Sequence, residues 1–244
     1  QVSSMLADDS GRIWVGMIDG LYRFCPEMGD LVPHSLSEQS GSLLHYSITV
    51  LYQTRDGMLW IGTPRGLNRL DPDRGTLKLF RNERTKAKDN IISSNFITAI
   101  HQDASGTLWI GTSWGLNRYH QKNDNFQCYF HQADRRDSLS HSAIHSLASD
   151  RSGNVWIGTR NGLNCWEKAR GRFTHYLTNP VHDGRSLNDT VWAIHADSNG
   201  RLWIGTFEGI RLFDPLKDRF ISIRHDECDP KSISQNDIRI VDKR

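Results

Sequence analysis

The sequence lacks several features that would assign it directly to a well-known class of protein. Of its 244 residues, 30 are Lys or Arg and 28 are Asp or Glu, so the formal net charge is only +2. A chain with so small a positive excess is not expected to bind the phosphate backbone of a nucleic acid. It contains no run of about 18 apolar residues, so no membrane-spanning segment is predicted. Its first residues, QVSSMLADDSG, lack the basic and apolar regions of a signal peptide.

Cysteine is also scarce. The four cysteines, Cys25, Cys128, Cys165 and Cys228, form no C-x-x-C pair and no Cys/His cluster with the spacing of a zinc site. We therefore favour ordinary thiols over a structural disulfide. With 37% hydrophobic and 24% charged residues, the composition is that of a water-soluble globular protein.

What the sequence does contain is a repeat. Five segments have the same pattern: RIWVGMIDGLYRF, MLWIGTPRGLNRL, TLWIGTSWGLNRY, NVWIGTRNGLNCW and RLWIGTFEGIRLF. Their tryptophans, spaced 46 to 49 residues apart, are Trp14, Trp60, Trp109, Trp156 and Trp203. Glycines recur three residues before each tryptophan, two residues after it, and four residues further on. This period falls in the range of β-propeller blades.

Each repeat is expected to form four short antiparallel strands. In the third repeat, the apolar run Leu108-Trp109-Ile110 has no alternation, so both faces of this strand must be buried. The turn before it, Asp103–Gly106, has the pattern of a tight hairpin, with an Asp that accepts backbone hydrogen bonds and a Gly with positive φ. A sheet with two apolar faces must stack on copies of itself. The sequence therefore predicts an all-β protein, a β-propeller whose tryptophans pack between blades and whose glycines allow close approach of the backbones.

The repeat also predicts how the chain is organised. Residues 1–244 form one propeller segment with five repeats, which begins with a strand at Val2–Leu6. A further strand, Ile238–Val241, is predicted as the first strand of another blade. A closed five-bladed ring has no place for this extra strand, so we expect the segment to belong to a longer propeller-bearing chain.

The motif W-I-G-T-x-x-G-L-N-R, preceded by D-x-x-G and followed by an aromatic residue, closely resembles the two-component regulator propeller repeat. The linkers before each repeat, such as residues 137–140, 186–188 and 232–234, resemble it too, and the resemblance covers essentially the whole chain. The first repeat departs from the motif at Met17 and Tyr22, and the fifth at Ile210 and Arg211.

This resemblance implies a seven-bladed propeller in the periplasmic sensor region of a bacterial inner-membrane receptor, whose output is a histidine kinase or a diguanylate cyclase. It implies a non-catalytic role in which a small molecule or an oligosaccharide is recognised and the signal passes to the remainder of the same receptor chain. It further implies pairing as a homodimer, no cofactor, and no membrane contact by this segment. The family has no general set of ligand residues that can be transferred by motif.

The sequence contains no recognisable catalytic motif. It has no H-E-x-x-H, P-loop, G-x-S-x-G or dinucleotide fingerprint, and Asp-rich turns such as residues 8–11 lack the acidic ligand set of a calcium loop. Threonines at identical places in four repeats indicate hydrogen bonding within blades rather than one active site: Thr63, Thr112, Thr159 and Thr206. We predict neither catalytic nor metal-binding residues.

Candidate ligand contacts are residues that differ from blade to blade at equivalent loop positions, because a ligand breaks the symmetry of the repeat. They lie inside G-T-x-x-G or in the first strand of a blade and the residues just before it. The candidates are Tyr46, Arg65, Phe96, Trp114, His141, Arg160, Asp189, Trp192 and Glu208. His145 and Trp192 also share an equivalent position that is held by Thr49 and Thr98 in other blades. The alternative is that loop residues vary because nothing selects them. His101 and His195 are predicted to be half-buried structural residues.

Three other functions remain open. A carbohydrate-binding lectin would have equivalent pockets in every blade, which the dissimilar loop pairs do not favour. A propeller enzyme of the streptogramin lyase type would need a clustered His/Glu metal site. A protein-interaction platform would use the same loops and cannot be separated from a small-molecule sensor by sequence.

Overall fold

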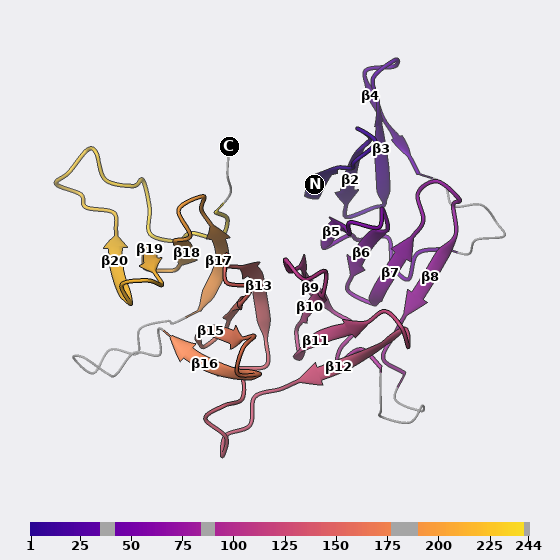
Figure 1. Ribbon diagram of the computed structural model, residues 1–244. Coiled ribbons are helices and arrows are strands. Elements are labelled where there is room, and N and C mark those ends of the chain that lie inside the picture. The colour runs from indigo at the N-terminus through magenta and orange to yellow at the C-terminus, as the bar shows by residue number, and fades with distance from the viewer. Residues whose placement is uncertain (35–41, 84–90, 177–189, 242–244) are drawn as a thin grey trace. The chain divides into compact units, whose positions relative to one another are not determined.

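The computed structural model describes residues 1–34, 42–83, 91–176 and 190–241 (Figure 1). These residues contain five four-stranded antiparallel sheets, which we call blades 1 to 5. Blade 1 is β1 (Val2–Ala7), β2 (Ile13–Met17), β3 (Leu21–Cys25) and β4 (Asp30–Pro33). Blade 2 is β5 (Val50–Gln53), β6 (Leu59–Thr63), β7 (Gly66–Leu70) and β8 (Leu77–Phe80). Blade 3 is β9 (Ile97–Gln102), β10 (Leu108–Thr112), β11 (Gly115–His120) and β12 (Asn125–Tyr129). Blade 4 is β13 (Ile144–Ser149), β14 (Val155–Thr159), β15 (Gly162–Glu167) and β16 (Arg172–Tyr176). Blade 5 is β17 (Val191–Ala196), β18 (Leu202–Thr206), β19 (Gly209–Asp214) and β20 (Arg219–Ile223).

The chain divides into two compact units. The first contains residues 1–102 and 106–128, with blades 1 to 3, and the second contains residues 103–105 and 129–244, with blades 4 and 5. Within each unit the first strands of neighbouring blades contact one another: β1 with β5, β5 with β9, and β13 with β17. The predicted all-β architecture of propeller-like, four-stranded antiparallel blades is confirmed.

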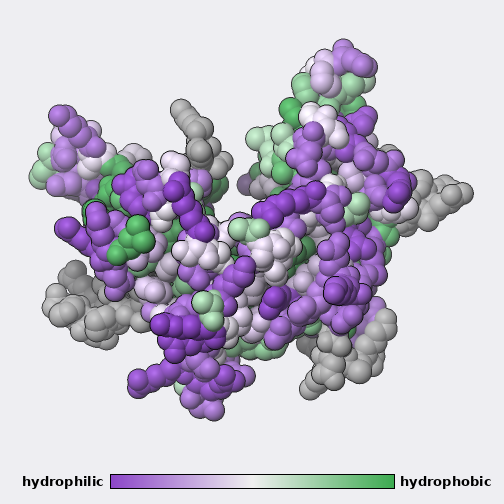
Figure 2. Space-filling view, in the orientation of Figure 1, coloured by the Kyte–Doolittle hydropathy of each residue, from purple (hydrophilic) through white to green (hydrophobic). Residues whose placement is uncertain are grey.

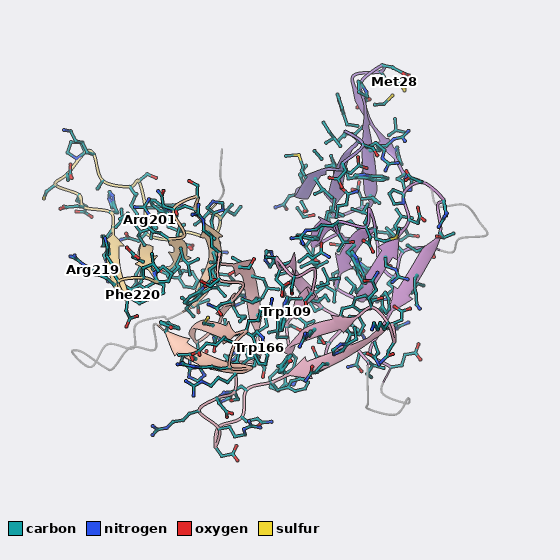
Figure 3. The ribbon with its side chains drawn as sticks, viewed as in Figure 1. Met28, Trp109, Trp166, Arg201, Arg219 and Phe220 are labelled. Carbon is teal, nitrogen blue, oxygen red and sulfur yellow. The ribbon has the colours of Figure 1, made fainter. Side chains whose placement is uncertain are left out.

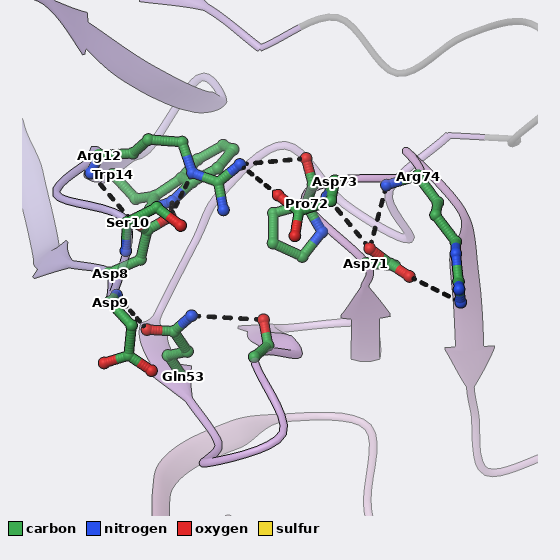
Figure 4. A network of polar contacts seen from close by, with 11 residues as sticks. Asp8, Asp9, Ser10, Arg12, Trp14, Gln53, Asp71, Pro72, Asp73 and Arg74 are labelled. Carbon is green, nitrogen blue, oxygen red and sulfur yellow. Dashed lines mark hydrogen bonds and ion pairs between the residues drawn. The ribbon is translucent and has the colours of Figure 1, made fainter.

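The Asp-x-x-Gly turn is formed as predicted, and it has an additional bond. In blade 1, Asp8 Oδ1 accepts the backbone N–H groups of Ser10 and Arg12, and Gly11 has a φ of 78°. The other oxygen, Oδ2, accepts the indole N–H of Trp14 at 2.8 Å and the Arg12 guanidinium at 2.6 Å (Figure 4). The indole bond recurs in Asp150–Trp156 and Asp197–Trp203. The turn therefore fixes the orientation of the tryptophan as well as the hairpin.

The repeated tryptophans pack against the next blade within each unit. Trp14 belongs to a buried cluster with Leu51, Leu59 and Leu70 of blade 2. Trp60 meets Tyr119 of blade 3 edge to face, with 5.0 Å between the ring centroids. In the second unit, Trp156 meets Phe213 of blade 5 at 5.4 Å. The predicted placement of the tryptophans between blades is confirmed by these contacts.

Aromatic side chains continue this packing to the edge of the second unit. Phe220 on β20, labelled in Figure 3, stacks on Phe213 with 4.3 Å between the ring centroids. Hydrophilic residues cover most of the face seen in Figure 2. The core of each unit therefore lies between its sheets.

The glycine two residues after the tryptophan is required by the approach of the next blade. A Cβ at Gly62 would lie 2.6 Å from Val50 Cγ1 of its own blade and 2.7 Å from Ile97 Cγ2 of blade 3. Both distances are too short for carbon atoms in contact. Any larger residue at Gly62 would therefore separate the two blades.

A buried asparagine explains the Asn of the G-L-N motif, which the sequence reading left unexplained. Asn68, Asn117 and Asn164 have no exposed surface. Their side-chain oxygens accept the N–H groups of Leu44, Ser93 and Ser140, respectively. Each asparagine thus fixes the linker that enters its own blade.

The extra strand predicted at Ile238–Val241 pairs with no other strand among the described residues. The N–H of Ile238 donates to the carbonyl of Thr206 at 2.9 Å. A strand requires a neighbouring strand to pair with, so the place of this segment as the first strand of another blade stays a prediction. All four cysteines are free thiols, as favoured above. No helix long and apolar enough to cross a membrane occurs among the described residues.

Candidate ligand-binding site

One position at the first strand is equivalent in all five blades, and in four of them it departs from regular pairing. We call it the bulge position. In blade 2 the equivalent residue, Thr49, directly precedes β5. The bulge position lies eleven residues before the repeated tryptophan. The ladder between the first and second strands shifts register around it at Ser3, Thr98, His145 and Trp192. A β-bulge leaves one residue out of the ladder and redirects its side chain. In sequence order, the equivalent residues are Ser3, Thr49, Thr98, His145, Trp192 and, before the tryptophan expected next, Arg239.

In blades 1 and 2 the bulge position holds a small hydroxyl group that links neighbouring blades. Ser3 Oγ donates to the carbonyl oxygen of Ile48 at 2.6 Å. Thr49 Oγ1 donates to the carbonyl oxygen of Ile97 at 2.7 Å. A short hydroxyl side chain at this position therefore serves blade-to-blade bonding.

In the second unit the same position holds large side chains that contact one another. The rings of His145 and Trp192 are 4.3 Å apart and inclined by 36°. The Arg239 guanidinium carbon lies 5.4 Å from the centre of the Trp192 ring. Phe207 meets Trp192 edge to face at 5.3 Å. The result is a cluster of aromatic and cationic groups from successive repeats.

This cluster borders a cavity of about 420 Å³. The residues that line it are Ala143, His145, Arg160, Thr190, Trp192 and Phe207. Arg160 and Phe207 hold equivalent places in the G-T-x-x-G turns of blades 4 and 5. Three rings, a hydroxyl and an arginine are thus gathered around one space, which is the usual composition of a small-molecule site.

Local hydrogen bonds position the loops that line the cavity. Thr159 Oγ1 donates to the carbonyl of Gly162 at 2.9 Å, and the same bond occurs at Thr63, Thr112 and Thr206. The expected role of these threonines within blades is therefore confirmed. The N–H of Arg160 donates to the carbonyl of Ala143, and Thr190 Oγ1 donates to the carbonyl of Arg160 at 3.0 Å. Arg160 is held by its backbone, and its side chain is exposed.

The electrostatics of the cavity are those of a positively charged region. Burial lowers the pKa of His145, and the positive charges of His141 and Arg160 lower it further. Burial also lowers the pKa of His141, and Arg160 and His131 add to the effect. Arg160 has no ion-pair partner among the described residues. Both histidines are therefore biased toward the neutral form, and they lie beside an arginine.

Among the described residues, four buried side-chain nitrogen or oxygen atoms have no hydrogen-bond partner. Two of them are ring nitrogens at the cavity, His145 Nε2 and Trp192 Nε1, and the others are Thr98 Oγ1 and Ser146 Oγ. A buried polar atom that lacks a partner destabilises the fold by about 1–3 kcal/mol, so such atoms are few in folded proteins and the two ring nitrogens call for an explanation. The same two residues occupy the bulge position of blades 4 and 5.

The structure brings together only some of the residues predicted from the sequence. Arg160 and Trp192 line the cavity, and the side chain of His141 lies beside it, where Nδ1 accepts the N–H of Ala143. Glu208 does not line the cavity, because its carboxylate is paired with Arg211 and Arg224 at 3.6 and 3.0 Å.

Four of the other candidates do not contribute to the cavity. Tyr46, Phe96 and Trp114 belong to the first unit and are 72%, 45% and 61% exposed. Arg65 is also exposed in that unit, and Asp189 lies outside the described residues. His101 and His195 are half-buried, as predicted.

Sequence reasoning missed Ala143 and Arg239. Arg239 could have been found by extending the repeat register into the last residues of the chain. Ala143 carries no sequence signal, since it lines the cavity only because of the way two blades meet.

A second cavity, of about 380 Å³, lies in the first unit beside Phe80, Phe126 and Asp124. Two acidic residues, Glu83 and Asp124, line it, and the Asp124 carboxylate is paired with Lys78 and Arg69. Among the described residues, no group of three or more His, Cys, Asp or Glu is placed to hold a metal ion. The cavity of blades 4 and 5 is therefore the stronger candidate site.

Comparison with known proteins gives a family and a fold. The model of the two-component regulator propeller family matches residues 42–65, 91–114, 138–161 and 186–208. Two similar solved structures are extracellular domains assigned to hybrid two-component systems of B. thetaiotaomicron. One is 21% identical, with a TM-score of 0.74, and covers 98% of this chain and 36% of that one. The other is 23% identical, with a TM-score of 0.74, and covers 94% and 31%.

A more distant similarity is to virginiamycin B lyase from Staphylococcus aureus, which is 11% identical with a TM-score of 0.63 and covers 91% of this chain and 69% of that one. At these identities the similarities show the fold alone. The chain spans about a third of the length of the two extracellular domains. No curated protein sequence matches the chain.

Proposed function

The chain is built from two-component regulator propeller repeats, and from this premise we propose that it is the ligand-binding part of a sensor region in a bacterial signalling receptor. In this proposal the propeller lies on the periplasmic side of the inner membrane and recognises a small molecule or an oligosaccharide. The remainder of the same receptor chain carries the output, and the propeller itself is non-catalytic.

Two observations support a role in sensing. The family repeat occurs four times in register, and the fold is similar to extracellular domains assigned to hybrid two-component systems. The similarity to a lyase, at 11% identity, concerns the fold and does not support a shared catalytic site.

The observation that carries the proposal is the loss of repeat symmetry at the cavity. A position that holds Ser3, Thr49 and Thr98 in the first unit holds His145 and Trp192 in the second. A structural role requires only the small hydroxyl group, as the bonds of Ser3 and Thr49 demonstrate. Large ring side chains with unpartnered nitrogens are not needed for that role, and they are suited to contact a ligand.

The proposal is tested in the intact receptor in its own bacterium. Cells are supplied in turn with single oligosaccharides and small metabolites, and transcription of the receptor's target genes is measured. We expect one class of compound to change the output, and we expect the double variant His145→Thr and Trp192→Thr to abolish that response while the protein remains in the membrane. An output that responds equally in the wild type and the double variant contradicts the assignment of the ligand site to this propeller.

A further inference from the structure

We propose that the cavity of blades 4 and 5 binds a ring-shaped ligand that carries one anionic group, with the anion at Arg160 and the ring against Trp192 and Phe207. This inference rests on the proposed function, since it names the chemistry of the ligand that the sensor recognises. The anionic group is a carboxylate, and the ring belongs either to an acidic sugar or to an aromatic acid.

The aromatic residues that line the cavity indicate that the ligand contains a ring. Trp192, His145 and Phe207 present three aromatic groups around about 420 Å³, a volume that accommodates a single six-membered ring with its substituents. The edge-to-face arrangement of Phe207 and Trp192 at 5.3 Å holds their rings at a fixed angle of 88°. Flat hydrophobic surfaces at a fixed angle favour a rigid planar or chair-shaped ligand over a flexible chain.

The charges of the cavity indicate an anion. The described residues that line it include Arg160 and no Asp or Glu. Burial lowers the pKa of His145, and the positive charges of His141 and Arg160 lower it further. A carboxylate bound at Arg160 would form a charge-assisted hydrogen bond with the guanidinium. A neutral ligand would lack this pairing of opposite charges.

The two unpartnered nitrogens indicate that the ligand carries a hydrogen-bond acceptor. The indole Nε1 of Trp192 is a donor only, and His145 Nε2 is a donor in one neutral tautomer and in the charged form. Protein atoms cover both nitrogens, so an acceptor on the ligand reaches them once the side chains that cover them shift. The oxygens of a carboxylate or of a sugar hydroxyl supply such acceptors. Binding would then satisfy groups that the free protein leaves without a partner.

The binding experiment uses the intact protein and two matched pairs of probes. The first pair is D-galacturonate and D-galactose, and the second is benzoate and benzyl alcohol, so that each acid is compared with a neutral ring of the same size. Affinities are measured by isothermal titration calorimetry at pH 7. We expect one acid to bind at least about tenfold more tightly than its neutral partner, which is the range of a hydrogen bond to a charged group. The ring that binds identifies the source of the carboxylate.

Variants assign the affinity to named side chains. Arg160→Gln is expected to abolish the preference for the acid, because it removes the charge from a side chain that forms no ion pair with a described residue. Arg170→Gln is the control: it makes the same change of charge in the same unit, on a residue paired with Glu167 in the β15–β16 turn. Trp192→Thr is expected to weaken both the acid and its neutral partner, because it replaces the ring with the residue that blades 2 and 3 carry there. Thermal melting of each variant checks that the fold is retained.

Several results would overturn the inference. These are equal affinity for an acid and its neutral partner, retention of the acid preference in Arg160→Gln, and no binding of any of the four probes. If a neutral compound activates the receptor through His145 and Trp192, the inference that the ligand is an anion is wrong, but the proposed sensing function still holds. A receptor whose output ignores every compound would instead overturn the proposed function.

Discussion

The substitution Asp197→Asn tests the link between the Asp-x-x-Gly turn and the stability of a blade. Burial raises the pKa of the Asp197 carboxyl, but the N–H groups of Arg201 and Asn199, the indole of Trp203 and the Arg201 guanidinium outweigh it and hold the pKa at about 2, below the ordinary 3.8. A folded-state pKa below the unfolded value stabilises the protein above about pH 4. This stabilisation is lost as the pH falls from about 4 to about 2.

The size of the effect follows from the two pKa values. Their difference corresponds to about 2.4 kcal/mol at neutral pH. The Asp197 side chain is 14% exposed, so solvent screening reduces the contribution to about 1–2 kcal/mol. Roughly half of it disappears in the wild type between pH 6 and pH 3. Asn keeps an acceptor oxygen but loses the charge, so the variant should lack most of this contribution at every pH.

The assay is urea unfolding followed by tryptophan fluorescence at pH 6, 4 and 3. Other carboxylates, such as Asp8, also have a lowered pKa, so the informative quantity is the difference between the wild type and the variant. We expect that difference to shrink from about 1–2 kcal/mol at pH 6 to about half of that at pH 3. A difference that stays constant over this range would refute the reasoning.

Three further outcomes are expected. Gly62→Ala should destabilise the first unit by about 2 kcal/mol, because its methyl group would overlap two neighbouring side chains; unchanged urea unfolding would contradict this. Trp156→Phe should cost about 1–2 kcal/mol through the lost bond to Asp150, and a smaller loss in an Asp150→Asn background checks the pairing. In the folded protein at pH 8 a thiol reagent should label exposed Cys228 quickly. It should spare Cys128 and Cys165, since burial raises the pKa of their thiols to about 11 and about 12; rapid labelling of either would contradict their burial.

The fold could be predicted from the sequence because every level of its structure repeats. The Leu-Trp-Ile run of the second strand, the Asp-x-x-Gly turn and the spacing of about 47 residues all indicate the same blade. The repeat does not specify which groups the side chains pair with in hydrogen bonds. The bond from Trp14 to Asp8 and the bonds of Asn68 depend on where side chains meet in space.

The candidate site could be predicted only in part. Arg160 and Trp192 were identified because they differ from their counterparts in other blades. The same criterion also selected Tyr46, Phe96 and Trp114, which are exposed in the first unit. Variation between repeats marks positions that are free to change, and it does not show which of them are brought together. That requires the contacts between blades, which depend on the packing of whole sheets.

The bulge position has a consequence for how recognition can change. Its side chain is outside the hydrogen-bonded ladder, so substitution there leaves the scaffold's pairing energy nearly constant. Serine, threonine, histidine and tryptophan already occupy it in one chain. A library that randomises only these equivalent codons would sample many binding chemistries on a single framework. Propellers of this kind can therefore diverge by substitutions in one repeat at a time, and each variant along the way still folds.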